Sequence, residues 1–155
     1  AVLLLGCGES SDAYHMSSPH PEGLGARLAM EGALAQAGLD TADIDYINLH
    51  GTATPNNDSA EGHAVASLFG TRVAASSTKG VTGHTLGAAG ALEISISAVA
   101  LAEGLLPGSV HTRKLDPSIP IDYVLASRGA PLNRAMSNSF GFGGSNCSVI
   151  LGRAG

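Results

Sequence analysis

The chain has 155 residues, and 44% of them are hydrophobic, which suits one domain with a sizeable core and excludes a mainly disordered chain. The net charge is −5, from eight Lys and Arg against 13 Asp and Glu, and no run of like charge occurs, so a nucleic-acid-binding protein is disfavoured. Glycine is abundant, with 21 residues, and tryptophan is absent, so we expect small aliphatic side chains packed against close backbone.

Strand-like and helix-like segments alternate along the chain. The predicted elements, identified by hydrophobic periodicity and flanking turn residues, are strands over 1–5, 45–49 and 72–76, helices over 23–37, 58–69 and 83–103, an extended piece over 121–126, and two final strands over 135–140 and 146–151. The first strand is a continuous apolar run, which is typical of a strand buried on both faces. Gly38 follows the first helix as a C′ glycine. Asn57 or Asp58 caps the second helix, and Glu61 completes a capping box if Asp58 is the cap.

This order of elements predicts a βαβαβαββ unit of the α/β class. Strands that alternate with helices form parallel sheets, and the terminal hairpin adds an antiparallel edge. No change in composition marks a linker, so we expect residues 1–155 to form one domain with a mixed five-stranded sheet. Because the chain begins at Ala1, within a predicted strand and without an initiator Met, we also expect a segment upstream of it.

Three features indicate a cytoplasmic protein that does not act in a membrane. Cys7 and Cys147 lie 140 positions apart in apolar, Gly-rich surroundings, and we predict two buried free thiols, as a reducing cytosol permits. The apolar run over 1–5 is too short for a signal sequence and lacks a basic flank. The longest apolar stretch, 86–102, is interrupted by one Glu and two Ser residues and is predicted to be a buried helix.

The strongest candidate site combines His50 and His84 with Lys79. Each histidine lies beside a glycine after a predicted strand, and the ends of parallel strands meet at one edge of a sheet. Two imidazoles there can donate hydrogen bonds to one developing oxyanion, as decarboxylation to an enolate requires. The dipole of a helix starting at residue 83 would keep His84 neutral, and the charge of Lys79 acts on both histidines in the same direction. On spacing alone, two structural histidines at strand ends are an equally good interpretation.

Three weaker patterns point to other chemistry. A Gly-x-Gly pair after the first strand lacks the third glycine of a dinucleotide fingerprint and precedes a loop. The segment 83–87, Gly-His-Thr-Leu-Gly, resembles the nucleophile elbow of serine-type hydrolases, with the β-branched Thr85 in the place of the nucleophile. His50, Asp58 and His63 could form a metal site, although capping explains Asp58 and a solvated helix face explains His63. We therefore expect neither a metal nor a cofactor.

Longer motifs resemble those of a known family. They are HGTATP at 50–55 followed by Asn57-Asp58, STKGVTGHTLGAAG at 77–90 and NSFGFGGSN at 138–146, together with DAYH at 12–15 and PHPEG at 19–23. In this order they resemble the carboxyl-terminal signatures of elongating β-ketoacyl-acyl-carrier-protein synthases, and they cover nearly the whole chain. That family has the thiolase-type fold, built from two similar βαβαβαββ halves. The resemblance therefore implies that residues 1–155 are a C-terminal thiolase-like domain and that the N-terminal half is absent.

The resemblance implies catalytic roles for four residues. His50 and His84 would orient a malonyl thioester and stabilise the enolate formed when it loses CO₂. Lys79 would be the active-site lysine, and the Phe142 N–H would supply one donor of an oxyanion hole.

The resemblance also implies supporting positions around these four. They are Asp58, Glu61 and Glu93 as acidic residues and candidate ion-pair partners, Thr52 and Thr54 as hydrogen-bonding partners of the phosphopantetheine arm of the substrate, and Phe140, Gly141 and Gly143 in the loop that gates the acyl pocket. Glu93 follows His84 by nine residues and so lies on the opposite helix face, where it would support the site without touching the substrate.

The implied reaction is a decarboxylating Claisen condensation of an acyl group with malonyl-acyl-carrier protein, in fatty acid or polyketide synthesis. The implied partners are acyl-carrier protein and, in the complete enzyme, a second copy of the subunit. The nucleophile of the family is a cysteine in a T-A-C-S segment, which is absent here, and neither Cys7 nor Cys147 has basic neighbours that would activate it. We therefore expect a fragment, a cleavage product or one piece of a split enzyme, inactive without the missing half. A non-catalytic partner resembling a chain-length factor is the alternative, and a serine-type hydrolase is the third hypothesis.

Overall fold

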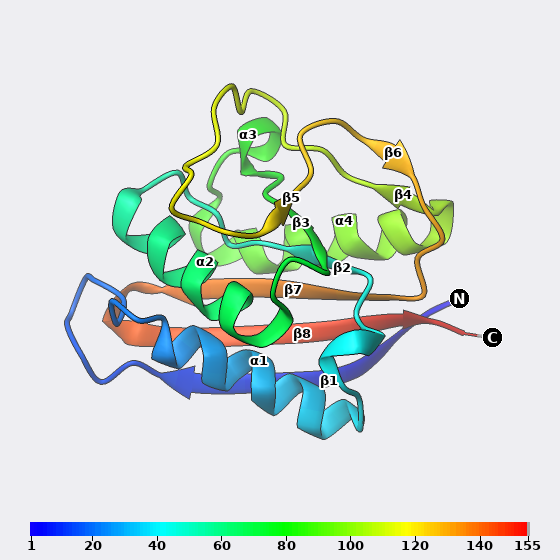
Figure 1. Ribbon diagram of the computed structural model, residues 1–155. Coiled ribbons are helices and arrows are strands. Elements are labelled where there is room, and N and C mark those ends of the chain that lie inside the picture. Colours follow the sequence, from blue (N-terminus) through cyan, green and yellow to red (C-terminus); the bar gives the residue numbers. More distant parts are fainter. Residues whose placement is uncertain (155) are drawn as a thin grey trace.

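The structure has three layers, with a mixed sheet between two layers of helices (Figure 1). It is a computed structural model that describes residues 1–154. Helices α1 (Leu24–Ala37) and α2 (Pro55–Phe69) cover one face of the sheet, and α4 (Ala89–Glu103) covers the other. The α/β class, the mixed sheet and the antiparallel hairpin expected from the sequence are confirmed.

The main sheet has six strands in the order β1-β8-β7-β2-β3-β5. Their bounds are β1 Val2–Ser11, β2 Tyr46–Asn48, β3 Ala74–Ser76, β5 Asp122–Tyr123, β7 Arg134–Gly141 and β8 Ser145–Arg153. One strand more than the predicted five is present, because part of the expected extended piece pairs with β3 as β5. Strand β8 is antiparallel to both of its neighbours, whereas β7, β2, β3 and β5 pair in parallel. The β7–β8 hairpin lies inside the sheet, because β1 pairs with its outer side.

Short elements connect these parts. They are η1 Thr41–Asp43, α3 Lys79–Thr82, η2 Leu86–Ala88, β4 Leu105–Leu106, β6 Arg128–Gly129 and η3 Phe142–Gly144. Strands β4 and β6 form a second, two-stranded antiparallel sheet.

Alternate residues of the central strands are buried on opposite faces of the sheet. On β2, Ile47 packs into the cluster under α1 and α2, whereas Tyr46 packs with Leu101 of α4. On β7, Met136 likewise packs into the cluster under α1 and α2, whereas Ala135 packs into the cluster with α4. Burial of a large apolar side chain contributes about 1.5–3 kcal/mol, so a slip by one residue would disrupt both clusters at once. The register that aligns the carboxyl ends of β2, β3 and β7 is therefore fixed by packing on both faces.

The prediction that the first strand is buried on both faces is wrong. Strand β1 is an edge strand, and Leu3 and Leu4 are 49% and 67% exposed. A continuous apolar run does not distinguish an edge strand from a central one, since periodicity reports only composition. Farther along β1, α1 approaches so closely that a Cβ at Gly8 would lie 2.0 Å from the Ala29 carbonyl oxygen. Helix α1 is therefore held against β1 through glycine.

The start of α2 differs from the prediction. The helix begins at Pro55 with Thr54 as its N-cap, so neither Asn57 nor Asp58 caps it. Proline is favoured in the first turn because its fixed φ suits a helix and its missing N–H has no helical partner to lose. The capping box with Glu61 is therefore absent, and that carboxylate is available for another role.

The third long helix begins later than predicted. Gly83 and Leu86 have φ angles of 72° and 55°, in the left-handed region that interrupts an α-helix, so α4 starts only at Ala89. His84 consequently lies in the turn between α3 and η2. The argument that a helix N-terminus keeps His84 neutral is wrong for this geometry.

Helix α4 is buried on one side only. The stretch Leu86–Glu103 has a mean hydropathy of 1.4. By length and composition alone it is long and apolar enough to cross a membrane, as are core helices of some soluble proteins. Ala100 and Leu101 are buried within the core that α4 forms with the sheet, whereas Val99 is 61% exposed. The helix thus covers the sheet and presents an apolar side away from it.

Candidate functional site

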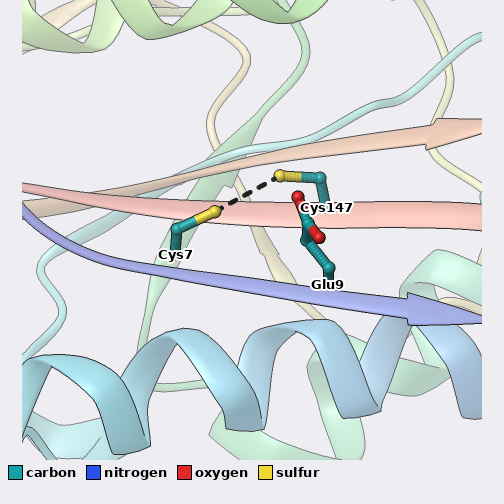
Figure 2. Close-up of side chains that lie close together, drawn as sticks. All are labelled: Cys7, Glu9 and Cys147. Atoms are coloured by element: carbon teal, nitrogen blue, oxygen red, sulfur yellow. Dashed lines mark hydrogen bonds between the residues drawn. The ribbon is translucent and has the colours of Figure 1, made fainter.

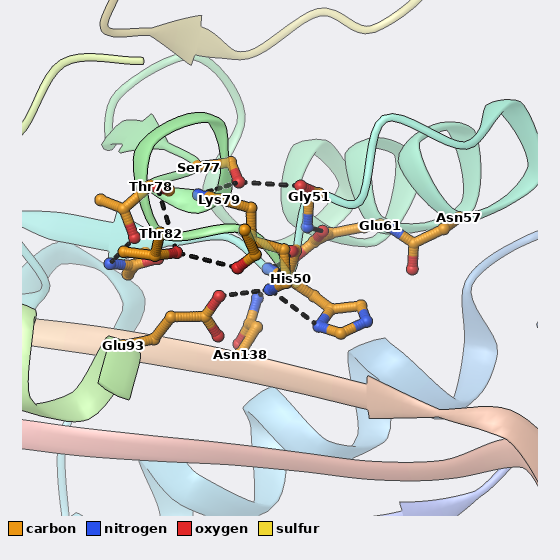
Figure 3. Close-up of polar contacts among 12 residues, drawn as sticks. His50, Gly51, Asn57, Glu61, Ser77, Thr78, Lys79, Thr82, Glu93 and Asn138 are labelled. Carbon is orange, nitrogen blue, oxygen red and sulfur yellow. Dashed lines mark hydrogen bonds and ion pairs between the residues drawn. The ribbon is translucent and has the colours of Figure 1, made fainter. Parts of the chain in front are cut away.

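His50 and Lys79 meet beyond the carboxyl ends of β2 and β3 (Figure 3). Both side chains are buried, with 6% and 8% of their residue surface exposed. The two strands are parallel neighbours in matched register, with Asn48 opposite Ser76, so the segments that follow them emerge at the same edge. The prediction that this edge gathers polar residues is confirmed.

The ammonium group of Lys79 has three acceptors around it. Nζ donates to the His50 carbonyl oxygen at 2.5 Å, lies 3.3 Å from His50 Nδ1 and forms an ion pair with Glu93. A lysine ammonium carries three protons and no acceptor, so these contacts match its full capacity. Nδ1 of His50 must then accept, and the ring proton of a neutral His50 lies on Nε2.

His50 is held in its neutral form. Burial, the charge of Lys79 and the neighbouring His84 lower the pKa of His50 from 6.5 to about 3. The three effects act in the same direction because each disfavours a second cation in a space with little water. At neutral pH the Nε2–H of His50 is therefore available as a hydrogen-bond donor.

Glu61 organises the backbone at His50. Its Oε1 and Oε2 accept hydrogen bonds from the backbone N–H groups of His50 and Gly51, each at 2.9 Å, and Asn138 Nδ2 donates to Oε1 at 3.2 Å. Burial raises the pKa of Glu61 to about 7, although the hydrogen bonds from Gly51, His50 and Asn138 oppose that shift. Glu61 thus positions the turn after β2 from its place on α2.

His84 and His50 lie next to each other on the wall of one cavity. The two rings are 5.4 Å apart between centroids and nearly perpendicular, at 84°. The Phe140 ring of β7 makes an edge contact with the His50 ring, with their centroids 5.8 Å apart. His84 is exposed and lines two cavities, of 980 and 640 Å³, the larger of which also contains His50. The larger cavity therefore has two imidazoles on its wall.

Other predicted site residues line the larger cavity. Thr52 and Thr54 both face it, and their hydroxyl groups hydrogen-bond each other at 2.8 Å. Phe142 also lines it, and its side chain is 85% exposed. Gly141 has ordinary extended backbone, whereas Gly143 has a φ of 82°, which a residue with a Cβ rarely adopts. The N–H of Gly143 donates to the Met16 carbonyl oxygen at 2.8 Å, which joins this loop to the one after β1.

The three acidic residues predicted to support the site have different surroundings. Among residues 1–154, only Glu93 forms an ion pair with Lys79, whereas Glu61 binds backbone and Asp58 accepts from Asn57. Burial raises the pKa of Glu93 while the hydrogen bond and charge of Lys79 oppose the shift. Burial likewise raises the pKa of Asp58. The candidate ion-pair assignment is therefore confirmed for Glu93 alone.

The two competing sites are not supported. Thr85 has φ and ψ angles of −83° and 18°, and the left-handed conformation falls on Leu86, so Thr85 is not a strained nucleophile. His63 is exposed on α2, and the side chains within residues 1–154 that could jointly hold a metal do not include His50, Asp58 and His63.

Sequence reasoning missed two residues that organise the site. Asn138 joins Glu61 to Ser148, whose hydroxyl donates to Asn138 Oδ1 at 2.8 Å. Ser77 donates to the Gly51 carbonyl oxygen at 2.8 Å and accepts from the Lys79 N–H at 3.3 Å. Both belong to the motifs at 77–90 and 138–146, and the available signal was a polar residue within a buried strand, for Asn138, or directly after one, for Ser77.

Comparison with known proteins identifies the class. Residues 1–113 match the family described as "Beta-ketoacyl synthase, C-terminal domain". The chain is 43% identical over 154 residues to 3-oxoacyl-[acyl-carrier-protein] synthase 2 of Coxiella burnetii, covering 97% of this chain and 37% of that relative. The chain therefore belongs to the beta-ketoacyl synthase family and spans about a third of the length of this relative.

Solved structures agree with this assignment. A chain of the complex of ketosynthase ApeO with its chain length factor ApeC from Xenorhabdus doucetiae superposes with a TM-score of 0.94 at 49% identity, covering 99% of this chain and 39% of that one. The second structure, AntDE:AntF, is the complex of a type II polyketide synthase acyl-carrier protein with its hexaketide-bound ketosynthase. One of its chains superposes with a TM-score of 0.94 at 26% identity, covering 98% of this chain and 38% of that one. The thiolase-type fold implied by the sequence motifs is thus confirmed.

Proposed function

We propose that this chain supplies the malonyl-activating part of a β-ketoacyl-acyl-carrier-protein synthase site. The reaction is the decarboxylating condensation of an acyl thioester with a malonyl thioester carried on acyl-carrier protein. The observation that carries the proposal is the pair of imidazoles, His50 and His84, whose ring centroids lie 5.4 Å apart on the wall of the 980 Å³ cavity.

The chemistry requires two donors at one oxygen. When a malonyl thioester loses CO₂, the electron pair of the breaking C–C bond moves toward the thioester carbonyl, whose oxygen becomes an enolate oxyanion. The Nε2–H of neutral His50 and one N–H of His84 stabilise that charge. Removal of one such donor typically costs about 10²–10³ in rate.

Lys79 acts in this proposal through His50. Its ammonium occupies Nδ1 and its positive charge disfavours protonation of the ring, so His50 remains a donor through decarboxylation. Glu93 holds that ammonium group in place through the ion pair. These two residues are therefore positioning residues.

The remaining roles follow from the cavity wall. Thr52 and Thr54 bind the phosphopantetheine arm that delivers the substrate, and the Phe142 N–H is a donor to the acyl thioester oxyanion. The enolate carbon then attacks the acyl carbonyl, and a cysteine thiolate from a segment outside these 155 residues leaves. Acyl-carrier protein is the proposed partner, as in the AntDE:AntF complex.

Decarboxylation of malonyl-acyl-carrier protein to acetyl-acyl-carrier protein, followed by mass spectrometry, tests the proposal. The chain is assayed alone and with the separately expressed remainder of the Coxiella burnetii synthase, with which condensation is expected. His84→Ala is the first variant, because this exposed side chain contributes little to packing, and it should lose about 10²-fold of the decarboxylation rate. His63→Ala, also an exposed histidine, is the matched control and should keep the rate. Decarboxylation that is absent in both forms, or equal in wild type and His84→Ala, would falsify the proposal.

A non-catalytic partner subunit is the alternative function. A partner such as a chain-length factor would bind a ketosynthase without decarboxylating malonyl thioesters, and it would not require His50, Lys79 and Glu93 to form a hydrogen-bonded unit. Tight association with a ketosynthase, combined with no decarboxylation, favours this alternative.

A further inference from the structure

Cys7, Glu9 and Cys147 form a cluster between the first and last strands (Figure 2). Cys7 and Glu9 are two residues apart on β1, and Cys147 lies directly opposite Glu9 in the antiparallel pairing with β8. Side chains alternate along a strand, so all three project from one face. The neighbouring Gly8 meets the backbone of α1 on the other face.

The spacing of the donor atoms suits one metal ion. The two Sγ atoms are 3.7 Å apart, and the two sulfurs and a Glu9 carboxylate oxygen all lie within 4.8 Å of one another. A tetrahedral zinc ion with bonds of about 2.3 Å holds two sulfurs about 3.8 Å apart. Both sulfurs could therefore bind one ion with little movement of β1 or β8.

We propose that Cys7, Glu9 and Cys147 bind one zinc ion or a similar soft divalent cation, with the fourth position taken by water. Thiolate sulfur selects zinc over magnesium and calcium, and a single carboxylate completes three protein ligands. Within residues 1–154, Glu9 takes part in no ion pair, so its charge is free to serve a cation. Glu9 is exposed and both cysteines are half-buried, which leaves a path for the ion and room for the water.

A metal explains this arrangement better than a disulfide does. The sulfur separation of 3.7 Å is far from the length of an S–S bond, about 2.0 Å. A carboxylate disfavours a neighbouring thiolate but strengthens a cation site.

The position of the cluster gives the ion two effects. It would join the first strand to the last across the β1–β8 pairing, which covers nine residue pairs. Glu9 and Cys147 also line the 980 Å³ cavity that contains His50 and His84, so a bound ion would fix these two side chains on that wall.

Titration of the reduced, oxygen-free chain with Co²⁺ tests the site, because ligation by thiolate sulfur gives a charge-transfer absorption that imidazole or carboxylate ligation lacks. We expect one Co²⁺ per chain with this band, displaced by Zn²⁺. Cys7→Ser and Cys147→Ser should each abolish the band, and Glu9→Gln should weaken affinity by at least about tenfold. Glu22→Gln removes one exposed carboxylate elsewhere and should bind Co²⁺ as the wild type does.

A second measurement needs no variant. Zn²⁺ should protect Cys7 and Cys147 of the wild-type chain from alkylation by iodoacetamide, as read by mass spectrometry, and a chelator should remove the protection. Absence of the charge-transfer band, its persistence in both serine variants, or full alkylation in the presence of Zn²⁺ overturns the proposal. A chain that oxidises to a Cys7–Cys147 disulfide and binds no Co²⁺ when reduced overturns it as well.

Discussion

Replacement of Lys79 by Met tests whether the buried ion pair with Glu93 stabilises the fold only as a pair. The side chains of Lys79 and Glu93 are 6% and 1% exposed, and Oε2 of Glu93 has no hydrogen-bond partner within residues 1–154. Met has nearly the length of Lys but carries no charge. In the variant, Glu93 must therefore stay charged without a cation or bind a proton.

The expected cost of Lys79→Met is about 3–5 kcal/mol, the range for breaking a buried ion pair by removing one partner. Glu93→Leu alone should cost a similar amount, because it leaves the ammonium without its carboxylate. The double variant keeps an apolar pair of similar volume and should be within about 2 kcal/mol of wild type, since desolvation of both charges is avoided. The coupling free energy between the two positions should then be about 4 kcal/mol or more.

Urea unfolding followed by circular dichroism, on the wild type, both single variants and the double variant, measures these free energies. Equal slopes with urea across the four proteins show that the same surface is exposed on unfolding. Single variants that each lose less than about 1 kcal/mol, the value of an exposed pair, would refute the reasoning. Costs that simply add in the double variant would refute it as well.

Three further predictions follow from the same geometry. The His50 ring should remain neutral, with its proton on Nε2, from pH 8 down to pH 5, and nitrogen NMR of labelled histidine that finds a charged ring at pH 5 contradicts the pKa of about 3. The folded-state pKa of Glu61 is raised from 4.5 to about 7, so the folded protein binds the Glu61 proton more tightly than the unfolded chain does. This proton adds about 3 kcal/mol to the free energy of unfolding below pH 4.5, and the contribution is lost as the pH rises through 7. As the pH rises from 5 to 8, Glu61→Gln should therefore gain stability relative to the wild type in urea unfolding. A difference in free energy of unfolding that does not change with pH argues against the raised pKa of Glu61. Gly8→Ala should cost about 3 kcal/mol, since its Cβ would meet the Ala29 carbonyl oxygen. Gly38→Ala, with open space around it and a φ of 64°, should cost only about 1 kcal/mol, and equal thermal stability of the two variants rules out close packing of α1 on β1.

The local sequence signals predicted much of the architecture. Helix α1 ends at Gly38 as expected, because glycine adopts the left-handed conformation there at little cost. The short parallel strands β2 and β3 lie within the predicted ranges, and the two strands of the β7–β8 hairpin extend one or two residues beyond theirs at each end. The predictions failed where two local interpretations were equally possible. The apolar run of β1 marks an edge strand, and the polar start of α2 has Thr54 rather than Asp58 as its cap.

The site was predicted as a set of residue types, and only the fold determined their contacts. Spacing along the chain placed His50, His84 and Lys79 near one sheet edge. The partners of Glu61 lie 10 and 11 residues away in the turn after β2 and 77 residues away on β7, and the partner of Glu93 lies 14 residues away at the start of α3. Both acids were predicted as candidate partners of a cation, yet one binds backbone N–H groups and the other binds Lys79. A linear pattern carries no information on which of two buried carboxylates reaches an ammonium.

By themselves, the 155 residues determined the class of fold, the order of its elements and the motifs of the beta-ketoacyl synthase family, because periodicity, capping residues and glycine positions act locally. Tertiary structure alone decided that Lys79 donates to His50 Nδ1, that the rings of His50 and His84 lie next to each other, and that Cys7 meets Cys147 from 140 residues away. The physical reason is that proton positions and donor distances depend on contacts between elements, which are set when both faces of the sheet are packed at once.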